Sequence, residues 1–89
     1  MGYAIELKPA AVRALAKLPK DAQKAIRFRI DALSDNPLPP KVKKLEGEEN
    51  LYRIRVGDYQ IVYQLQKEIP LILVVKIGHR KEVYRRMQN

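Results

Sequence analysis

Residues 51–64 alternate apolar and polar side chains on both sides of a Gly57-Asp58 pair. Such alternation predicts two β-strands, and a two-residue connection with glycine first favours a type II′ hairpin turn. That turn sets Arg55 directly opposite Gln60 and fixes which side chains share a face. The apolar face carries Tyr52, Ile54, Val56, Tyr59, Ile61, Tyr63 and Leu65. The hairpin therefore needs other elements to cover this face.

The opposite face of the hairpin carries two arginines, Arg53 and Arg55, together with Gln60, Val62 and Gln64. Side chains two residues apart on a strand lie roughly 6.5 to 7 Å apart, close to the spacing of neighbouring phosphates on a nucleic-acid strand. Arginine binds phosphate oxygens through paired hydrogen bonds. The pattern predicts a phosphate-binding surface, although alternating charges on a strand are also typical of a face that only contacts water.

Two helices are expected before the hairpin. Pro9 favours the first turn of one helix, and Pro19 separates it from a second, which ends before Pro37. Apolar residues at helical spacing predict the buried faces. They are Val12, Leu15, Ala16 and Leu18 in the first helix, and Ala22, Ile26, Ile30 and Leu33 in the second.

The remaining segments complete a single α+β domain over residues 1–89. Residues 3–8 favour a short strand, and residues 71–77 are apolar and β-branched, as in a central strand that ends at Gly78. Residues 79–86 favour one or two helical turns. We expect an N-terminal strand, a two-helix hairpin, a three-stranded antiparallel meander that completes a twisted sheet, and a short C-terminal helix.

The charge balance points to a polyanionic partner. The chain has 18 Lys and Arg against 10 Asp and Glu, a net charge of +8, which suits RNA, DNA or an acidic protein. It has no cysteine and one histidine, so thiolate metal sites and a histidine-only zinc site are excluded. No apolar run is long enough to span a bilayer, and no signal peptide is visible. We expect a cytoplasmic protein with no membrane contact.

Several motifs together resemble the RelE branch of the RelE/ParE toxin superfamily, over nearly the whole chain. They are Leu45-x-Gly47, the hairpin Tyr52-Arg-Ile-Arg-Val-Gly-Asp-Tyr59, Ile61-Val-Tyr63, and Gly78-His-Arg80 followed by Val83-Tyr84. The resemblance implies a toxin of a type II toxin-antitoxin pair, a ribosome-dependent endoribonuclease that cleaves messenger RNA in the decoding site without a metal or other cofactor. Its implied partners are the ribosome with its mRNA, a cognate antitoxin with an acidic or amphipathic segment, and operator DNA only through that antitoxin.

The resemblance also implies site residues. Arg53 and Arg55 match two basic strand residues of the family, and Arg80 and Tyr84 match the arginine and tyrosine after its last strand. This chain departs from the pattern at Gln60, which replaces a cation that would help hold the scissile phosphate. It also has arginines where some members carry lysines. Because arginine stays protonated, Arg53 and Arg55 can stabilise charge but cannot act as the base.

Further candidates come from the residues themselves. Imidazole titrates near neutrality, so His79 is a candidate general base, although a lone histidine at a strand end is more often structural. Tyr84 follows Arg80 by one helical turn and can stack on a base or pass a proton, unless it belongs to the core. Lys41, Lys43 and Lys44 are candidate contacts to ribosomal RNA phosphates, although a lysine-rich loop equally serves solubility alone. Gln60 and Lys81 complete the set of candidate RNA contacts.

Two other functions fit the same sequence. One is that of the ParE-like branch, whose members block DNA gyrase without chemistry and generally lack the full set of three arginines and a tyrosine. The other is a non-enzymatic RNA-binding module, which the net charge alone would allow.

Overall fold

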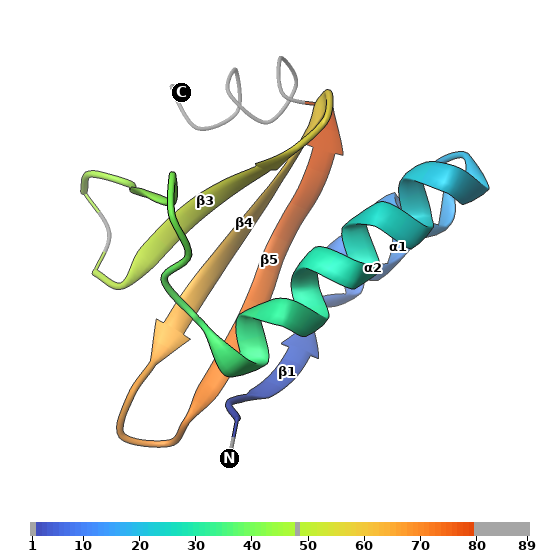
Figure 1. Cartoon of the computed structure of the whole chain (residues 1–89). Helices are drawn as coiled ribbons and strands as arrows, with labels where there is room; N and C mark the ends of the chain where they lie inside the picture. Colours follow the sequence, from blue (N-terminus) through green and yellow to red (C-terminus); the bar gives the residue numbers. More distant parts are fainter. Residues whose placement is uncertain (1, 48, 80–89) are drawn as a thin grey trace.

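The computed structural model describes residues 2–47 and 49–79 as a five-stranded sheet packed against two helices (Figure 1). In chain order the elements are β1 (Ala4–Leu7), α1 (Pro9–Ala16), α2 (Lys20–Asp35), β2 (Lys43–Lys44), β3 (Leu51–Val56), β4 (Tyr59–Gln66) and β5 (Leu71–His79). The sheet order is β1-β5-β4-β3-β2. The strand β1 runs parallel to β5, and all other neighbours are antiparallel. The expected α+β fold with its antiparallel meander is confirmed; the predicted C-terminal helix lies outside the described residues.

The hairpin of β3 and β4 has the predicted register. Arg55 pairs with Gln60, and Tyr52 pairs with Tyr63. Gly57 takes a φ of 59°, in the left-handed region that the first central residue of a type II′ turn requires and that glycine adopts without steric cost. This register decides which side chains face the helices.

A β-bulge in β5 resets the alternation of its side chains. Val62 on β4 pairs with Lys76, but the next residue, Tyr63, pairs with Val74, so β5 carries one extra residue at Val75. Ile72, Val74 and Ile77 all join the same core. Without the bulge, strict alternation would turn residue 76 toward the core with residues 72 and 74. The bulge thus places an apolar side chain in the core and Lys76 on the opposite face.

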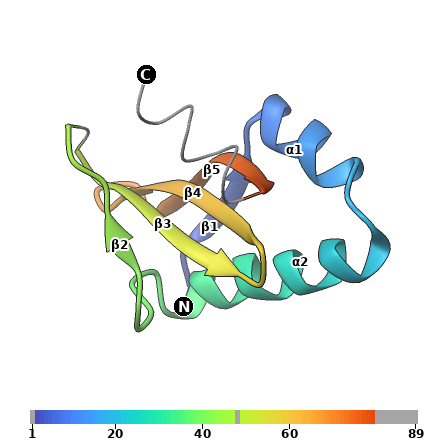
Figure 2. The same ribbon diagram turned by 90° about the horizontal axis from the view of Figure 1, so that it is seen from above.

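Both helices lie on one side of the sheet and cover its apolar face (Figures 1 and 2). The predicted face of α2 is confirmed, but two residues predicted to be buried in α1 are exposed, Val12 by 50% and Ala16. The short helix α1 instead buries Ala11 and Leu15, one turn apart. The core cluster comprises Ala11, Leu15, Ile26, Ile30, Leu33, Ile54, Ile61, Tyr63, Leu65, Ile72, Val74 and Ile77.

Tyr63 connects the sheet to the segment that follows α2 by a hydrogen bond. Its ring is fully buried and stacks on Tyr52 with ring centroids 5.9 Å apart. Its hydroxyl donates a 2.6 Å hydrogen bond to the carbonyl oxygen of Pro37. Burial, with a smaller electrostatic contribution from Tyr52, raises the pKa of Tyr63 to about 12.

This pKa predicts alkaline destabilisation. A tyrosine in the unfolded chain ionises near pH 10, whereas Tyr63 in the folded protein stays neutral to about pH 12. Its contribution to stability is therefore complete below pH 10 and is lost as the pH rises toward 12, by about 3 kcal/mol in total. Urea unfolding at successive pH values measures this loss. The Tyr63→Phe variant should be about 1 kcal/mol less stable than wild type at pH 7. Its free energy of unfolding should fall less steeply above pH 10 than that of wild type. Parallel plots of unfolding free energy against pH for the two proteins would contradict the raised pKa of Tyr63.

Candidate nucleic-acid interface

The face of the sheet turned away from the helices carries the predicted arginines, and we call it the arginine face. Paired residues on neighbouring strands point to the same side of a sheet. The pairs Lys43 with Arg53, Arg53 with Val62, and Val62 with Lys76 therefore form one row across β2, β3, β4 and β5. Arg55 lies in the next row, beside Gln60. The fold thus brings together cations from three strands.

Lys76 is a residue of this face that sequence reasoning missed. A lysine within the apolar run of residues 71–77 was the available signal. Its direction depends on the bulge at Val75, which no local pattern in the sequence marks. Lys76 is half-buried, as is Arg53.

The middle of the arginine face is less open than predicted. Arg55 is exposed, but Gln60 is only 1% exposed and Val62 is fully buried. Both residues lie on β4, the central strand of the sheet, so each has neighbours on two sides. The side-chain oxygen Oε1 of Gln60 has no hydrogen-bond partner among the described residues. The expectation that residue 60 lies on an open surface is wrong, and its part in RNA binding stays a prediction.

His79 lies on the other side of the sheet from the arginines. The strand β5 does not end at Gly78, as we expected, but continues to His79, because Tyr59 and Gln60 of β4 supply pairing partners for both residues. His79 pairs with Tyr59, a residue of the helix-covered face, and the two rings meet edge to face with centroids 6.1 Å apart. The fold does not bring His79 together with Arg53 and Arg55, and its role as a base stays a prediction.

A basic cavity of about 590 Å³ adjoins the arginine face at the β2 edge of the sheet. Its charged lining residues are Arg29, Lys41, Lys43, Arg53 and Arg55, and no acidic residue lines it. Arg29 comes from α2 and was not predicted, because the helical pattern identified only the buried side of that helix. The two predicted lysines of β2 point to opposite sides of the sheet. Lys43 lies in the row with Arg53, whereas Lys44 pairs with Tyr52 and points to the helix-covered side.

Three predicted site residues, Arg80, Lys81 and Tyr84, lie outside the described residues. Within residues 2–47 and 49–79, no group of three or more His, Cys, Asp or Glu side chains is placed to hold a metal ion. In the same part of the chain, no helix is long and apolar enough to cross a membrane.

Comparison with known proteins decides the family. Residues 5–84 match the model of the family described as ParE toxin of type II toxin-antitoxin system, parDE. The chain belongs to the RelE/ParE superfamily of type II toxins. This RelE-type toxin is 32% identical to Toxin RelE3 of Methanocaldococcus jannaschii, over 82% of this chain and 85% of the relative. It is 30% identical to Toxin RelG of Mycobacterium tuberculosis, over 97% of this chain and the whole relative.

Solved structures support the RelE branch. The crystal structure of the archaeal RelE-RelB complex from Pyrococcus horikoshii contains a chain that is 33% identical to this RelE-type toxin. The two chains superpose with a TM-score of 0.80, over 90% of this chain and 97% of the other. The resemblance inferred from the sequence motifs is confirmed.

Proposed function

We propose that this toxin is a ribosome-dependent endoribonuclease that cleaves messenger RNA in the decoding site and thereby inhibits translation and growth. The supporting observation is the arginine face itself. Arg53 and Arg55 stand two residues apart on β3; Lys43 pairs with Arg53, and Lys76 lies in the same row beyond Val62. A cationic face of this kind, in a RelE-type toxin, suits a phosphodiester that must be held while it reacts.

The proposed reaction uses the RNA as its own nucleophile. The ribose 2′-oxygen loses its proton and bonds to the adjacent phosphorus, and the bond from phosphorus to the 5′-oxygen of the next nucleotide breaks. That 5′-oxygen takes up a proton, so the products are a 2′,3′-cyclic phosphate and a 5′-hydroxyl. Negative charge grows on the phosphorane oxygens, where Arg53 and Arg55 stabilise it by charge-assisted hydrogen bonds. No step requires a metal ion.

The proton transfers need other groups, since both arginines of β3 stay protonated. Arg80 and Tyr84 are our proposed additional catalytic residues, Arg80 as a cation at the phosphate and Tyr84 as a base-stacking or proton-passing group. His79 remains the candidate base by chemistry. His79 lies beside Tyr59, on the opposite side of the sheet from the arginines. To take the proton from the 2′-hydroxyl, its imidazole would have to approach the RNA around the edge of the sheet.

The proposal is tested by inducing the toxin in growing cells and mapping messenger RNA 5′ ends by their position within codons. New ends inside translated regions, at a preferred codon position, are expected. The family description also names ParE, so gyrase inhibition is the rival function. DNA damage or altered supercoiling without new RNA ends would favour that rival, and RNA binding without cleavage would favour a non-enzymatic module.

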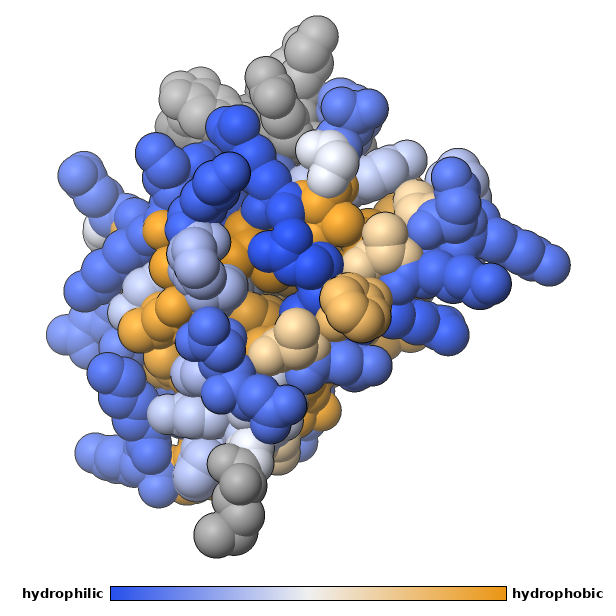
Figure 3. Space-filling view, in the orientation of Figure 1, coloured by the Kyte–Doolittle hydropathy of each residue, from blue (hydrophilic) through white to orange (hydrophobic). Residues whose placement is uncertain are grey.

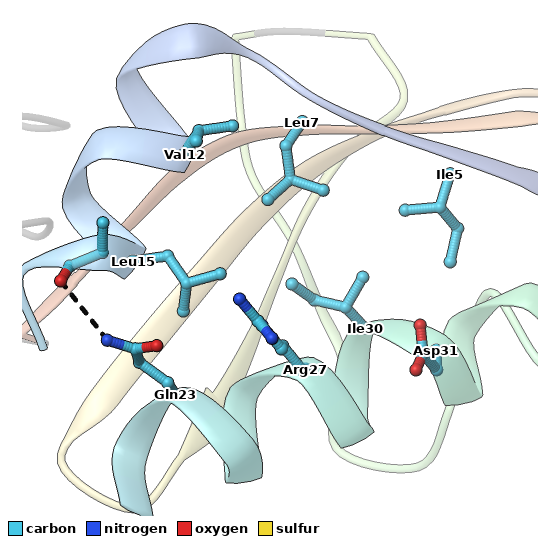
Figure 4. Close-up of a pocket in the computed structure, with 9 residues that line it drawn as sticks. Ile5, Leu7, Val12, Leu15, Gln23, Arg27, Ile30 and Asp31 are labelled. Atoms are coloured by element: carbon cyan, nitrogen blue, oxygen red, sulfur yellow. Dashed lines mark hydrogen bonds between the residues drawn. The ribbon is translucent and has the colours of Figure 1, made fainter. Parts of the chain in front are cut away.

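We further propose that a cognate antitoxin with an amphipathic, acidic segment binds this toxin in the cytoplasm. Apolar residues reach the surface in patches among hydrophilic ones (Figure 3). One groove, of about 510 Å³, lies between β1, α1 and α2. Figure 4 shows apolar side chains facing this space from all three elements; they are Ile5, Leu7, Val12, Leu15 and Ile30. Arg27 and Asp31 also line the groove, and Arg27 suits an acidic residue of the partner.

Val12→Asp should weaken antitoxin binding by at least tenfold. The substitution would put a negative charge into the apolar part of the groove. A tenfold loss of affinity corresponds to about 1.4 kcal/mol of binding free energy. Val12 is half-exposed, so the fold should tolerate the change. Titration with the product of the neighbouring small open reading frame measures the affinity. Ile69→Asp, at an exposed residue in the turn between β4 and β5, is the control; equal affinities for both variants would place the antitoxin elsewhere.

A further inference from the structure

Lys76 is the cation of the arginine face that neither the motifs nor the family comparison assigns. It comes from β5, whereas Arg53 and Arg55 come from β3, and only the bulge at Val75 turns it to their side. Lys76 and Gln60 are close neighbours in the sheet, because Gln60 pairs with Gly78 and Val62 pairs with Lys76. A cation thus stands one row away from the position where this chain has an uncharged glutamine.

The surroundings of Val62 indicate where the charged ends of Arg53 and Lys76 lie. Val62 is fully buried although it faces away from the helices, and its two partners in the row are Arg53 and Lys76. Both partners are half-buried. Long cationic side chains commonly pack their aliphatic stems on an apolar neighbour while the charged end stays in water. Packing of this kind would place both charged ends at the surface above Val62.

The spacing suits two adjacent phosphates, one at each cation. Arg53 and Lys76 are two strands apart, which separates their backbones by about 9 to 10 Å. Side chains of this length can reach two adjacent phosphate groups from that separation. Gly78, in the next row, has no side chain to block an approach from that direction. Lys43 extends the row toward the basic cavity at the β2 edge.

We propose that Lys76 contacts the backbone phosphate of the bound messenger RNA next to the scissile one, one row away from the uncharged Gln60. This inference rests on the proposed function. It implies that the RNA backbone crosses the strands, from the β2 edge over Arg53 toward β5, rather than following β3. The lysine then holds the RNA in register while Arg53 and Arg55 meet the charge that develops during the reaction.

The test compares wild type, Lys76→Gln, Lys76→Arg and the control Lys67→Gln, which removes an exposed lysine in the turn between β4 and β5. Binding to ribosomes programmed with a messenger RNA that has 2′-deoxy nucleotides in the decoding site is measured at several monovalent salt concentrations. Loss of one phosphate contact should make the slope of log affinity against log salt shallower by about 0.7. Lys76→Gln should show this change, and Lys76→Arg and Lys67→Gln should not.

Single-turnover cleavage of the ribonucleotide message provides the second measurement. Lys76→Gln should cleave at least roughly tenfold more slowly than wild type, and Lys76→Arg should retain most of the rate. An unchanged salt slope in Lys76→Gln would overturn the inference even if wild type cleaves. The same holds if Lys76→Gln weakens only antitoxin binding. A wild type that does not cleave would refute the proposed function, while the salt slopes would still decide whether Lys76 contacts the message.

Discussion

Arg55→Gln is expected to slow cleavage of ribosome-bound messenger RNA by about 10²-fold or more and to leave the fold intact. Arg55 is exposed on the arginine face, so the substitution removes little packing. The loss should fall on the rate of the chemical step, because an oriented cation stabilises charge that exists only in the transition state. Single-turnover rates at saturating ribosome concentration measure it.

Lys24→Gln is the matched control for Arg55→Gln. Lys24 is an exposed cation on α2, away from the arginine face, and its loss changes the net charge by the same amount. Its cleavage rate should stay within about twofold of wild type. If both variants lose activity equally, the effect comes from overall charge and Arg55 has no special role. If Arg55→Gln cleaves at the wild-type rate, Arg55 does not act on the reacting phosphate.

Ile61→Ala is expected to lower the free energy of unfolding by about 2 to 5 kcal/mol. Ile61 is fully buried on β4 and belongs to the core cluster shared by the sheet and both helices. The free energy of unfolding of a small domain is about 5 to 15 kcal/mol in total. This loss alone is therefore enough to unfold a marginally stable protein. Chemical denaturation measures it.

Ile69→Ala separates the effect of burial from that of residue type. Ile69 is 70% exposed, and its truncation should change the stability by less than about 0.5 kcal/mol. Toxicity lost in Ile61→Ala should return at a lower growth temperature that repopulates the folded state, whereas Arg55→Gln should stay inactive at every temperature. A stability of Ile61→Ala equal to that of wild type would contradict the assigned core.

The parts of the fold that follow from local patterns were predictable from the sequence. Alternation around Gly57 gave the hairpin register, because a two-residue turn leaves only one way to pair the strands. The apolar spacing in α2 identified Ile26, Ile30 and Leu33 as buried. The same face assignment put Arg53 and Arg55 together on β3.

The features that were missed depend on tertiary structure. The bulge at Val75 is a property of two paired strands, so the direction of Lys76 could not be read from one of them. The side of the sheet taken by His79 follows from its pairing with Tyr59 rather than from its distance to the arginines along the chain. Gln60 is buried because β4 is the central strand, and strand order is not encoded in local alternation.

The most direct test of the central claim uses purified ribosomes programmed with a defined message and this toxin alone. We predict cleavage within the decoding-site codon, with a 2′,3′-cyclic phosphate on one fragment and a 5′-hydroxyl on the other. A single 2′-deoxy substitution at the nucleotide that supplies the attacking oxygen should abolish that cut. Cleavage that persists at the substituted nucleotide, or no cleavage of the unmodified message, would contradict the central claim. That claim is that the arginine face promotes attack by the 2′-hydroxyl of the RNA on the adjacent phosphate.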